Sequence, residues 1–452
     1  MRLSKDLSTC RIPKAEFARL MAMTGPFEAC PEIAVACSGG ADSLTLALLI
    51  DAWARARGGT ATALIVDHGI RENSLKEAEA VAVNLGERGM TCEILCNKTQ
   101  VGTSNIQATA RKVRYELLQR WCSVNGNLHL AFAHNQEDQA ETVLLRLARG
   151  SGSDGLAAMA PISETPSVRI LRPLLGVPRT RLQATLDHWN VKHIDDPSNR
   201  NRKFARVRMR SLSPVLAAEG LTAQRLAGTA ARLARTRNSL ESEVAVTLAR
   251  SAIVYPSGYC HLSPQPLCRM SEEIALRALA RVLICIGGNG YTPRLERIER
   301  LYAWLQDGTP GGGRTLAGCR LLPCTSGLLV CREVSAAKSV VPAKGNLLWD
   351  GRFRLRLGTR SIGDVKRLGT EGWRLAVAAV PALRKSTIPS AVLAGLPAIW
   401  NDRKLRSVPH LGLLDGKKLL PGRHPHKVVF APLHPLVPAC FTLQKGRYTL
   451  SK

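Results

Sequence analysis

Short apolar runs alternate with longer stretches of helical periodicity between Glu32 and about Leu186. The runs over residues 33–37, 61–66, 92–95 and 128–133 are rich in Val, Ile, Leu and Ala, which is typical of buried strands. The stretches over 43–57, 75–88, 105–122 and 137–147 have the apolar spacing of helices. This alternation predicts an α/β fold with a parallel, doubly wound, Rossmann-like sheet, and functional loops at the carboxyl ends of its strands.

The pattern changes after Pro197, where six basic residues follow in a short stretch: Arg200, Arg202, Lys203, Arg206, Arg208 and Arg210. Helical segments rich in Ala, Leu and Arg then cover about 221–248, 272–286 and 294–305. Beyond a Gly/Pro break at 308–313 the chain is strand-like and rich in Pro and Gly. We predict an α/β domain over 1–212, a mainly helical domain over 213–335 and a mixed, β-rich, basic domain over 336–452.

The chain is strongly basic. Its 452 residues include 63 Lys and Arg against 35 Asp and Glu, a net charge of +28, and residues 331–452 alone hold 22 basic and 6 acidic side chains. This surplus favours a polyanionic partner, nucleic acid first, over an anionic membrane or a merely solvated surface. No apolar run approaches the ~18 residues of a transmembrane helix, and Met1 to Phe27 lacks a signal-peptide core. We therefore expect a cytoplasmic protein without a membrane partner.

Thirteen cysteines are spread from Cys10 to Cys440, and no two of them have the C-x-x-C spacing. That spacing typically places two thiolates on one zinc ion or iron–sulfur cluster. The closest pairs, Cys92 with Cys96 and Cys319 with Cys324, lack it. The sequence therefore signals neither kind of metal site.

The strongest local signal is the turn from Ser38 to Ser43 (S-G-G-A-D-S), which follows an apolar strand and opens a helix. Its paired glycines let backbone N–H groups approach an oxyanion, the helix N-terminus adds partial positive charge, and the serines add hydroxyl donors. Asp42 either caps the helix or holds Mg²⁺. No G-x-x-x-x-G-K-S/T pattern places a lysine on a γ-phosphate. The turn therefore indicates phosphate binding without γ-phosphoryl transfer.

This turn resembles the S-G-G-x-D-S signature of the PP-loop ATP pyrophosphatases, and four further stretches resemble one of their families, the tRNA(Ile)-lysidine synthases. They are V-D-H-G-I-R over 66–71, A-R-K-V-R-Y over 110–115, A-H-N-Q-E-D-Q-A-E-T over 133–142 and D-D-P-S-N over 195–199. Three positions depart from the family pattern. Asn135 replaces a second histidine and leaves His134 as the better candidate, Glu137 replaces an aspartate and keeps its charge, and Val207 replaces an asparagine.

The resemblance implies a set of site residues. ATP would be bound by Ser38, Gly39, Gly40, Asp42, Ser43, Asp67 and His68, with Mg²⁺ on Asp42, and lysine by Asp138, Glu141, Arg111, Arg114 and His134. The implied catalytic residues are Asp42, Asp138, Glu141 and Arg114, and the implied tRNA contacts are Arg200, Arg202, Lys203, Arg206 and Arg208. The spacing itself puts Asp138 and Glu141 on one side of a predicted helix, where they suit a cation, either a lysine ammonium or Mg²⁺.

The implied reaction joins L-lysine to C2 of the wobble cytidine of an isoleucine tRNA with a CAU anticodon. ATP would activate the C2 oxygen as an adenylate, releasing pyrophosphate, and the lysine amine would then displace AMP. The resemblance also implies that residues 1–212 are the catalytic domain, that the domains over 213–335 and 336–452 bind tRNA, and that a homodimer is plausible. Three other functions stay open: a PP-loop tRNA thiolase, a non-catalytic RNA-binding protein and a glutamine-dependent amidotransferase. The lack of C-x-x-C, the intact turn and the lack of a glutaminase motif count against them in that order.

Overall fold

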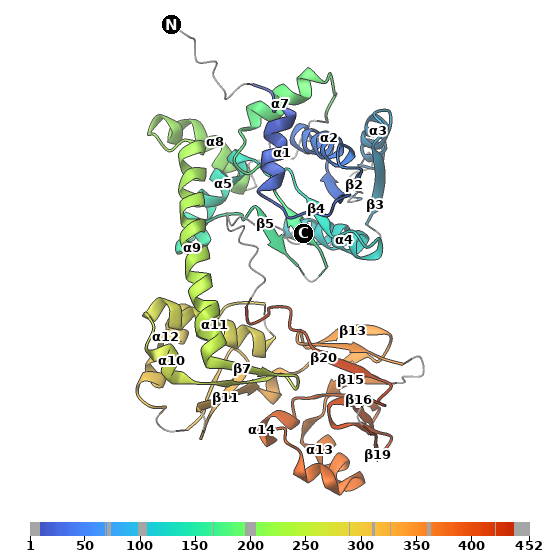
Figure 1. Ribbon diagram of the computed structural model, residues 1–452, viewed down its shortest axis with the longest axis vertical. Coiled ribbons are helices and arrows are strands. Elements are labelled where there is room, and N and C mark those ends of the chain that lie inside the picture. Colours follow the sequence, from blue (N-terminus) through green and yellow to red (C-terminus); the bar gives the residue numbers. More distant parts are fainter. Residues whose placement is uncertain are drawn as a thin grey trace, which may run out of the picture. The chain divides into compact units, whose positions relative to one another are not determined.

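The computed structural model describes residues 10–67, 69, 74–97, 106–165, 167–194, 205–288, 290–309, 312–325, 327–358, 363–420 and 422–437. Contacts divide the chain into two compact units, the first reaching Asn238 and the second starting at Ser239 (Figure 1). No helix in the described part is long and apolar enough to cross a membrane. The predicted domain limits at residues 212 and 335 stay predictions, because a division by contacts does not show which segments fold independently.

The first unit is built on one six-stranded sheet with the order β3-β2-β1-β4-β6-β5. Its strands are β1 (Glu32–Cys37), β2 (Thr60–Asp67), β3 (Thr91–Cys96), β4 (His129–Ala131), β5 (Ile162–Glu164) and β6 (Arg169–Leu171). Its helices are α1 (Lys14–Ala22), α2 (Ala41–Arg55), α3 (Ser74–Gly86), α4 (Ile106–Val124), α5 (Gln136–Leu147), α6 (Ser153–Leu156), α7 (Arg179–His188) and α8 (Ala205–Ala218), followed by α9 (Ala223–Ser251), which enters the second unit. Among the strands of this sheet in the described residues, β5 alone runs antiparallel to its neighbour.

Helices cover both faces of this sheet. Ile33 and Val35 point to the core shared with α1, α2, α3 and α7, whereas Ala34 points to the opposite core, which is shared with α4. Successive side chains of a strand alternate between the two faces, so a strand buried on both must be apolar throughout. This is why β1 reads as a continuous apolar run in the sequence.

The strand order reverses between β1 and β4, which are hydrogen-bonded neighbours in parallel register, Val35 opposite Ala131. From β1 the chain proceeds to β2 and β3 on one side, and from β4 to β6 on the other. The loops that follow β1 and β4 therefore leave the same edge of the sheet next to each other. Doubly wound sheets bind their ligands at this reversal.

The parallel α/β fold predicted from the apolar runs is confirmed, and the four predicted strands correspond to β1, β2, β3 and β4. The sequence did not predict β5, β6, α1 or α7. The strands β5 and β6 have three residues each, too few to show a periodicity.

The second unit combines helices with three antiparallel sheets. One sheet, β7-β8-β11-β10-β9, consists of β7 (Ala252–Tyr255), β8 (Tyr259–Leu262), β9 (Arg314–Leu316), β10 (Cys319–Cys324) and β11 (Gly327–Arg332), with α10 (Pro264–Cys268), α11 (Glu272–Gly287) and α12 (Leu295–Gln306) in the same segment. A second contains β12 (Val341–Pro342), β15 (Asp364–Arg367), β16 (Pro397–Asn401), β17 (Lys404–Val408), β18 (Leu413–Leu414) and β19 (Lys417–Lys418), with α13 (Gly369–Ala379) and α14 (Ser390–Leu393) in this region. The third contains β13 (Asn346–Trp349), β14 (Phe353–Arg356) and β20 (Lys427–Phe430). Helices in the middle and a strand-rich end agree with the prediction.

We expect acid to destabilise the second unit through His410. Its Nε2 lies 3.2 Å from the carbonyl oxygen of Pro256, its ring packs edge-on against Phe353, and burial lowers its pKa to about 4. Between pH 6.5 and 4 the unfolded chain therefore binds a proton at His410 that the folded chain does not bind. As the pH is lowered through this range, the free energy of unfolding decreases by up to about 3 kcal/mol.

His410→Gln tests this, because a glutamine amide can donate to the same carbonyl but does not titrate. Melting temperatures between pH 7.5 and 4 should fall less steeply for the variant than for the natural protein. Parallel slopes for the two proteins would contradict the assignment to His410.

Candidate functional site

The turn that follows β1 is stabilised by hydrogen bonds of the Ser43 side chain. The Oγ atom of Ser43 accepts a hydrogen bond from the backbone N–H of Ser38 at 3.1 Å and donates to the carbonyl of Gly40 at 2.9 Å. Gly39 has a φ of +79°, and a Cβ there would lie 2.6 Å from Cγ2 of Val81, so only glycine fits. Gly40 is the N-cap of α2, which begins at Ala41, and as a glycine it has no side chain to cap the helix. The backbone N–H of Ser43 already donates to the carbonyl of Gly40 at 3.1 Å, so the part of the helix start that can face an anion lies before Ser43.

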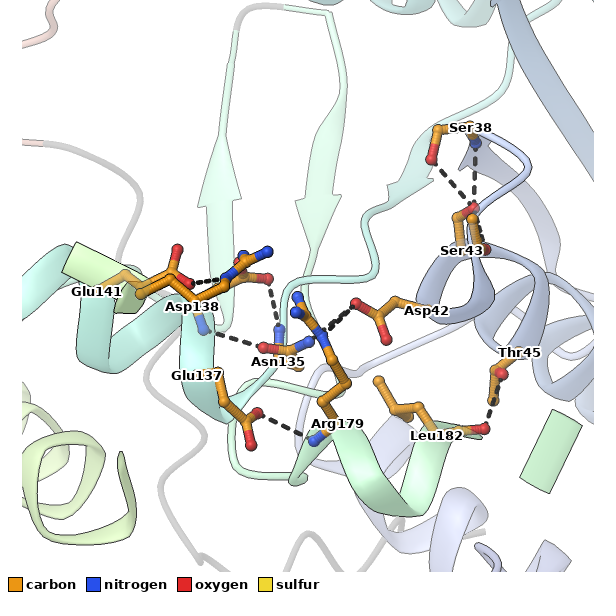
Figure 2. Close-up of polar contacts among 12 residues, drawn as sticks. Ser38, Asp42, Ser43, Thr45, Asn135, Glu137, Asp138, Glu141, Arg179 and Leu182 are labelled. Carbon is orange, nitrogen blue, oxygen red and sulfur yellow. Dashed lines mark hydrogen bonds and ion pairs between the residues drawn. The ribbon is translucent and has the colours of Figure 1, made fainter. Parts of the chain in front are cut away.

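Asp42, in the first turn of α2, has one engaged and one unengaged oxygen (Figure 2). Its Oδ2 accepts hydrogen bonds from Nδ2 of Asn135 at 3.0 Å and from Nε of Arg179 at 3.2 Å. Its Oδ1 is buried without a hydrogen-bond partner among the described residues. Burial raises the pKa of Asp42, Arg179 opposes this, and the negative charges of Asp138 and Glu137 add to it.

Asn135 connects this turn to α5. The side-chain oxygen of Asn135 accepts a hydrogen bond from the backbone N–H of Asp138 at 2.9 Å. The backbone N–H of Asn135 donates in return to Oδ2 of Asp138 at 3.1 Å, and this pair of bonds is a capping box at the start of the helix. The side-chain amide of Asn135 simultaneously donates to Asp42. An asparagine carries both an acceptor and a donor, so this departure from the family pattern joins α5 to the turn from Ser38 to Ser43.

Glu141 repeats the arrangement seen at Asp42. It is 2% exposed; its Oε1 accepts from Nε of Arg210 at 2.8 Å, while its Oε2 is buried without a partner in the described part of the chain. Arg210 comes from α8, which packs against α5. Burial raises the pKa of Glu141, and Arg210 opposes the rise. Half-buried Asp42 and buried Glu141 thus each have an arginine on one oxygen and no described partner on the other, buried oxygen.

His134, directly after β4, lies in an aromatic and cationic cluster. The rings of Tyr115 and Phe132 stack at 4.8 Å, those of Phe132 and His134 at 5.8 Å, and the guanidinium of Arg111 lies 5.1 Å from the Tyr115 ring. Burial, followed by the charges of nearby arginines, holds the pKa of His134 well below its usual range. Those arginines are Arg172, Arg111, Arg206 and Arg114. His134 is therefore neutral at physiological pH.

The remaining predicted residues lie at the end of β2, on α8, or outside the described residues. Asp67 orders its own loop, since its Oδ1 accepts from the backbone N–H of Gly69 at 2.9 Å and from Oγ of Ser74 at 2.6 Å. The predicted residues His68, Arg200, Arg202 and Lys203 lie outside the described residues. Arg206 and Arg208 lie on α8, the helix that also carries Arg210.

Comparisons with known proteins identify the family. Residues 14–216 match the family described as PP-loop domain. A tRNA(Ile)-lysidine synthase from Ruegeria pomeroyi is 35% identical over 385 residues, which are 85% of this chain and 90% of that protein. The chain belongs to the tRNA(Ile)-lysidine synthase family.

A lysidine synthase from Wolbachia sp. subsp. Brugia malayi is 32% identical over 84% of this chain and 89% of that protein. Among solved structures, the U34-tRNA thiolase NcsA from Methanococcus maripaludis aligns with a TM-score of 0.43 and 20% identity, over 49% of this chain and 78% of that one, and has no weight here. Membership of the lysidine synthase family confirms the resemblance read from the motifs. The protein is an ATP-dependent, tRNA-modifying enzyme.

Within this lysidine synthase fold, two arginines at the site were missing from the predicted set. Arg179 follows Pro178 at the start of α7 and has no motif around it, so no local signal marks it. Arg210 belongs to the basic stretch, which suggested RNA contact and not an ion pair with Glu141. Among the described residues, no group of three His, Cys, Asp or Glu side chains is arranged to hold a metal ion.

Proposed function

We propose that this protein ligates L-lysine to C2 of the wobble cytidine of isoleucine tRNA with a CAU anticodon, through an adenylated tRNA, releasing AMP and pyrophosphate. The observation that supports this best is the pair of carboxylates Asp42 and Glu141, each of which has one buried oxygen without a partner among the described residues. One begins the helix of the phosphate-binding turn and the other lies on the neighbouring acidic helix. Two cationic groups, one accompanying ATP and one from lysine, suit these oxygens.

We assign ATP to the turn from Ser38 to Ser43 and Mg²⁺ to Asp42. Gly39 and Gly40 leave the backbone open to phosphate oxygens, and the serine hydroxyls lie 3.2 Å apart beside them. Mg²⁺ usually takes one or two carboxylates and completes its shell with water and phosphate oxygens, which fits the single unpartnered oxygen of Asp42. When bound, Mg²⁺ supplies charge neutralisation for the phosphates.

We assign lysine to side chains of α5 and α4 and to His134, which directly follows β4. Asp138 and Glu141 would bind an ammonium group, and Arg111 and Arg114 would bind the carboxylate, beside neutral His134. The Nε atom of Arg114 is buried without a described hydrogen-bond partner, so a donor is left for an anion. These residues hold and orient the reactants, and no enzyme nucleophile is required.

We assign tRNA contacts to Arg206 and Arg208 on α8 and to one face of the sheet β13-β14-β20. That face exposes two cross-strand rows: Leu348, Arg354 and Val429, and then Asn346, Arg356 and Lys427. Arg356 lies directly opposite Lys427, and these strands contain no acidic residue. Like charges on facing positions destabilise a sheet unless an anion lies over them. A phosphodiester backbone is such an anion.

Replacing Arg354, Arg356 and Lys427 together by glutamine is therefore expected to weaken tRNA binding about tenfold and to reduce the salt slope of binding by about two to three. Affinity for ATP should not change. The matched control replaces three exposed cations elsewhere in this unit, Arg374, Arg384 and Lys385. An equal loss in the control would assign the effect to net charge and not to this face. Substitution is preferred to truncation near 336, because one buried core includes Leu329 and Cys331 as well as Leu368 and Trp400.

The proposed function is tested by incubating the purified protein with ATP, labelled lysine and isoleucine tRNA with a CAU anticodon. Label should enter the tRNA, with one AMP and one pyrophosphate released per lysine. Binding of tRNA without labelling would favour a non-catalytic RNA-binding protein, and sulfur transfer would favour a thiolase. The proposal extends to a cytoplasmic location and to a homodimer, which light scattering on the purified protein tests.

A further inference from the structure

Arg179 lies where three helices of the first unit meet (Figure 2). Its backbone N–H, at the start of α7, donates to Oε2 of Glu137 on α5 at 2.9 Å. Its side-chain Nε donates to Oδ2 of Asp42 on α2 at 3.2 Å. One residue thus connects the acidic helix and the phosphate-binding helix.

The charge of Arg179 is surrounded by acidic groups. The carboxylates of Asp42, Asp138, Glu141 and Glu137 all act on its guanidinium. Among the described residues, Arg179 is the cation that pairs with Asp42, as Arg210 pairs with Glu141. A carboxylate with one oxygen fixed by an arginine and an amide has little freedom to rotate, so its other oxygen stays in one place.

We propose that Arg179 is a positioning residue for ATP binding: by holding Oδ2 of Asp42 together with Asn135, it keeps Oδ1 available for the cation that accompanies ATP. This inference rests on the proposed function, in which Asp42 binds Mg²⁺. Arg179 acts through Asp42 and is not itself assigned a contact with substrate.

A purely structural role for the guanidinium does not fit the way α7 is anchored. The helix is fixed by the backbone bond of Arg179 to Glu137, by the bond from Oγ1 of Thr45 to the carbonyl of Leu182 at 3.1 Å, and by the ion pair of Arg181 with Glu16 at 2.7 Å. All three remain when only the Arg179 side chain is replaced. Replacing the Arg179 side chain should therefore change mainly the orientation of the Asp42 carboxylate, which the guanidinium holds.

Removal of the Arg179 side chain should affect the binding of ATP and the binding of lysine differently. Without Arg179, Asp42 loses its fixed orientation, so binding of ATP together with Mg²⁺ weakens. Lysine binding should stay equal or become tighter, because a positive charge disappears from the vicinity of Asp138 and Glu141. A misfolded variant would instead lose active enzyme and leave both KM values unchanged.

The experiment compares Arg179→Met and Arg179→Lys with the natural protein, and uses Arg181→Met as the control on the same helix. Calorimetry measures binding of α,β-methylene ATP, which is stable at the bond that is attacked, with Mg²⁺ and with a chelator. We expect Arg179→Met to weaken binding about tenfold with Mg²⁺ and much less without it. Arg179→Lys should recover part of this loss, since it keeps the charge but not the planar fork.

Arg181→Met should bind the analogue normally, with a lower melting temperature because Glu16 loses its partner. Equal affinities of Arg179→Met and the natural protein in the presence of Mg²⁺ would overturn the positioning role, as would an equal loss with and without Mg²⁺. If the natural protein itself binds no analogue or attaches no lysine to tRNA, the proposed function fails instead. The two failures are therefore distinguishable.

Discussion

Replacing Asp42 by asparagine is expected to lower lysine incorporation into tRNA by about a thousandfold, a loss typical of removing a group that stabilises developing charge. The substitution keeps the size of the side chain and an oxygen for Asn135 and Arg179. It puts an uncharged amide where the buried, unpartnered Oδ1 lies. Single-turnover labelling with saturating ATP measures the chemical step without the contribution of product release.

Asp51→Asn on the same helix is the matched control for this experiment. Asp51 pairs with Arg55 at 2.8 Å, one turn further on, and takes no part in the site. It should lose less than twofold in labelling, in keeping with the small contribution of such surface pairs. If Asp42→Asn retained activity within a factor of ten, Asp42 would not be the ligand of the metal, and the role assigned to the turn would be wrong.

The part of this site that the sequence predicted is the part built from local pattern. The turn from Ser38 to Ser43 lies between an apolar strand and a helix, so its position at the sheet edge follows from the chain itself. Asp138 and Glu141 follow from their spacing on one helix. The turn and the helix that carries Asp138 and Glu141 lie close together because parallel strands end at one edge of the sheet, and β1 and β4 are neighbours where the strand order reverses.

The two arginines follow from no local pattern. Arg179 lies 137 residues from Asp42 in the chain, and the two meet because α2 packs against α7. Arg210 reaches Glu141 over 69 residues, through the packing of α8 on α5. Side chains so far apart in sequence are brought together by tertiary packing, which periodicity does not encode. Asn135 had a local signal, since an asparagine three residues before Asp138 is typical of a helix cap.

Replacing Glu141 by glutamine is expected to raise the KM for lysine about a hundredfold while leaving the affinity for ATP unchanged. In the natural protein Oε1 accepts from Arg210 and Oε2 has no described partner, although the side chain is 2% exposed. Removing one member of a buried, hydrogen-bonded charge pair typically costs about 2 to 5 kcal/mol. Steady-state labelling at varied lysine and at varied ATP separates the two KM values.

Under the proposed assignment, the loss in Glu141→Gln would have two physical sources, a missing contact to the lysine ammonium and an arginine left without its counter-charge. Adding Arg210→Met removes the second source alone. If the lysine contact dominates, the double variant stays as poor in lysine KM as the single one, and this is the expected result. Recovery of the natural KM in the double variant would show that Arg210 repels lysine when unpaired, and that Glu141 serves only to neutralise it. Glu116→Gln, at an exposed carboxylate paired with Lys112 on α4, should change neither KM.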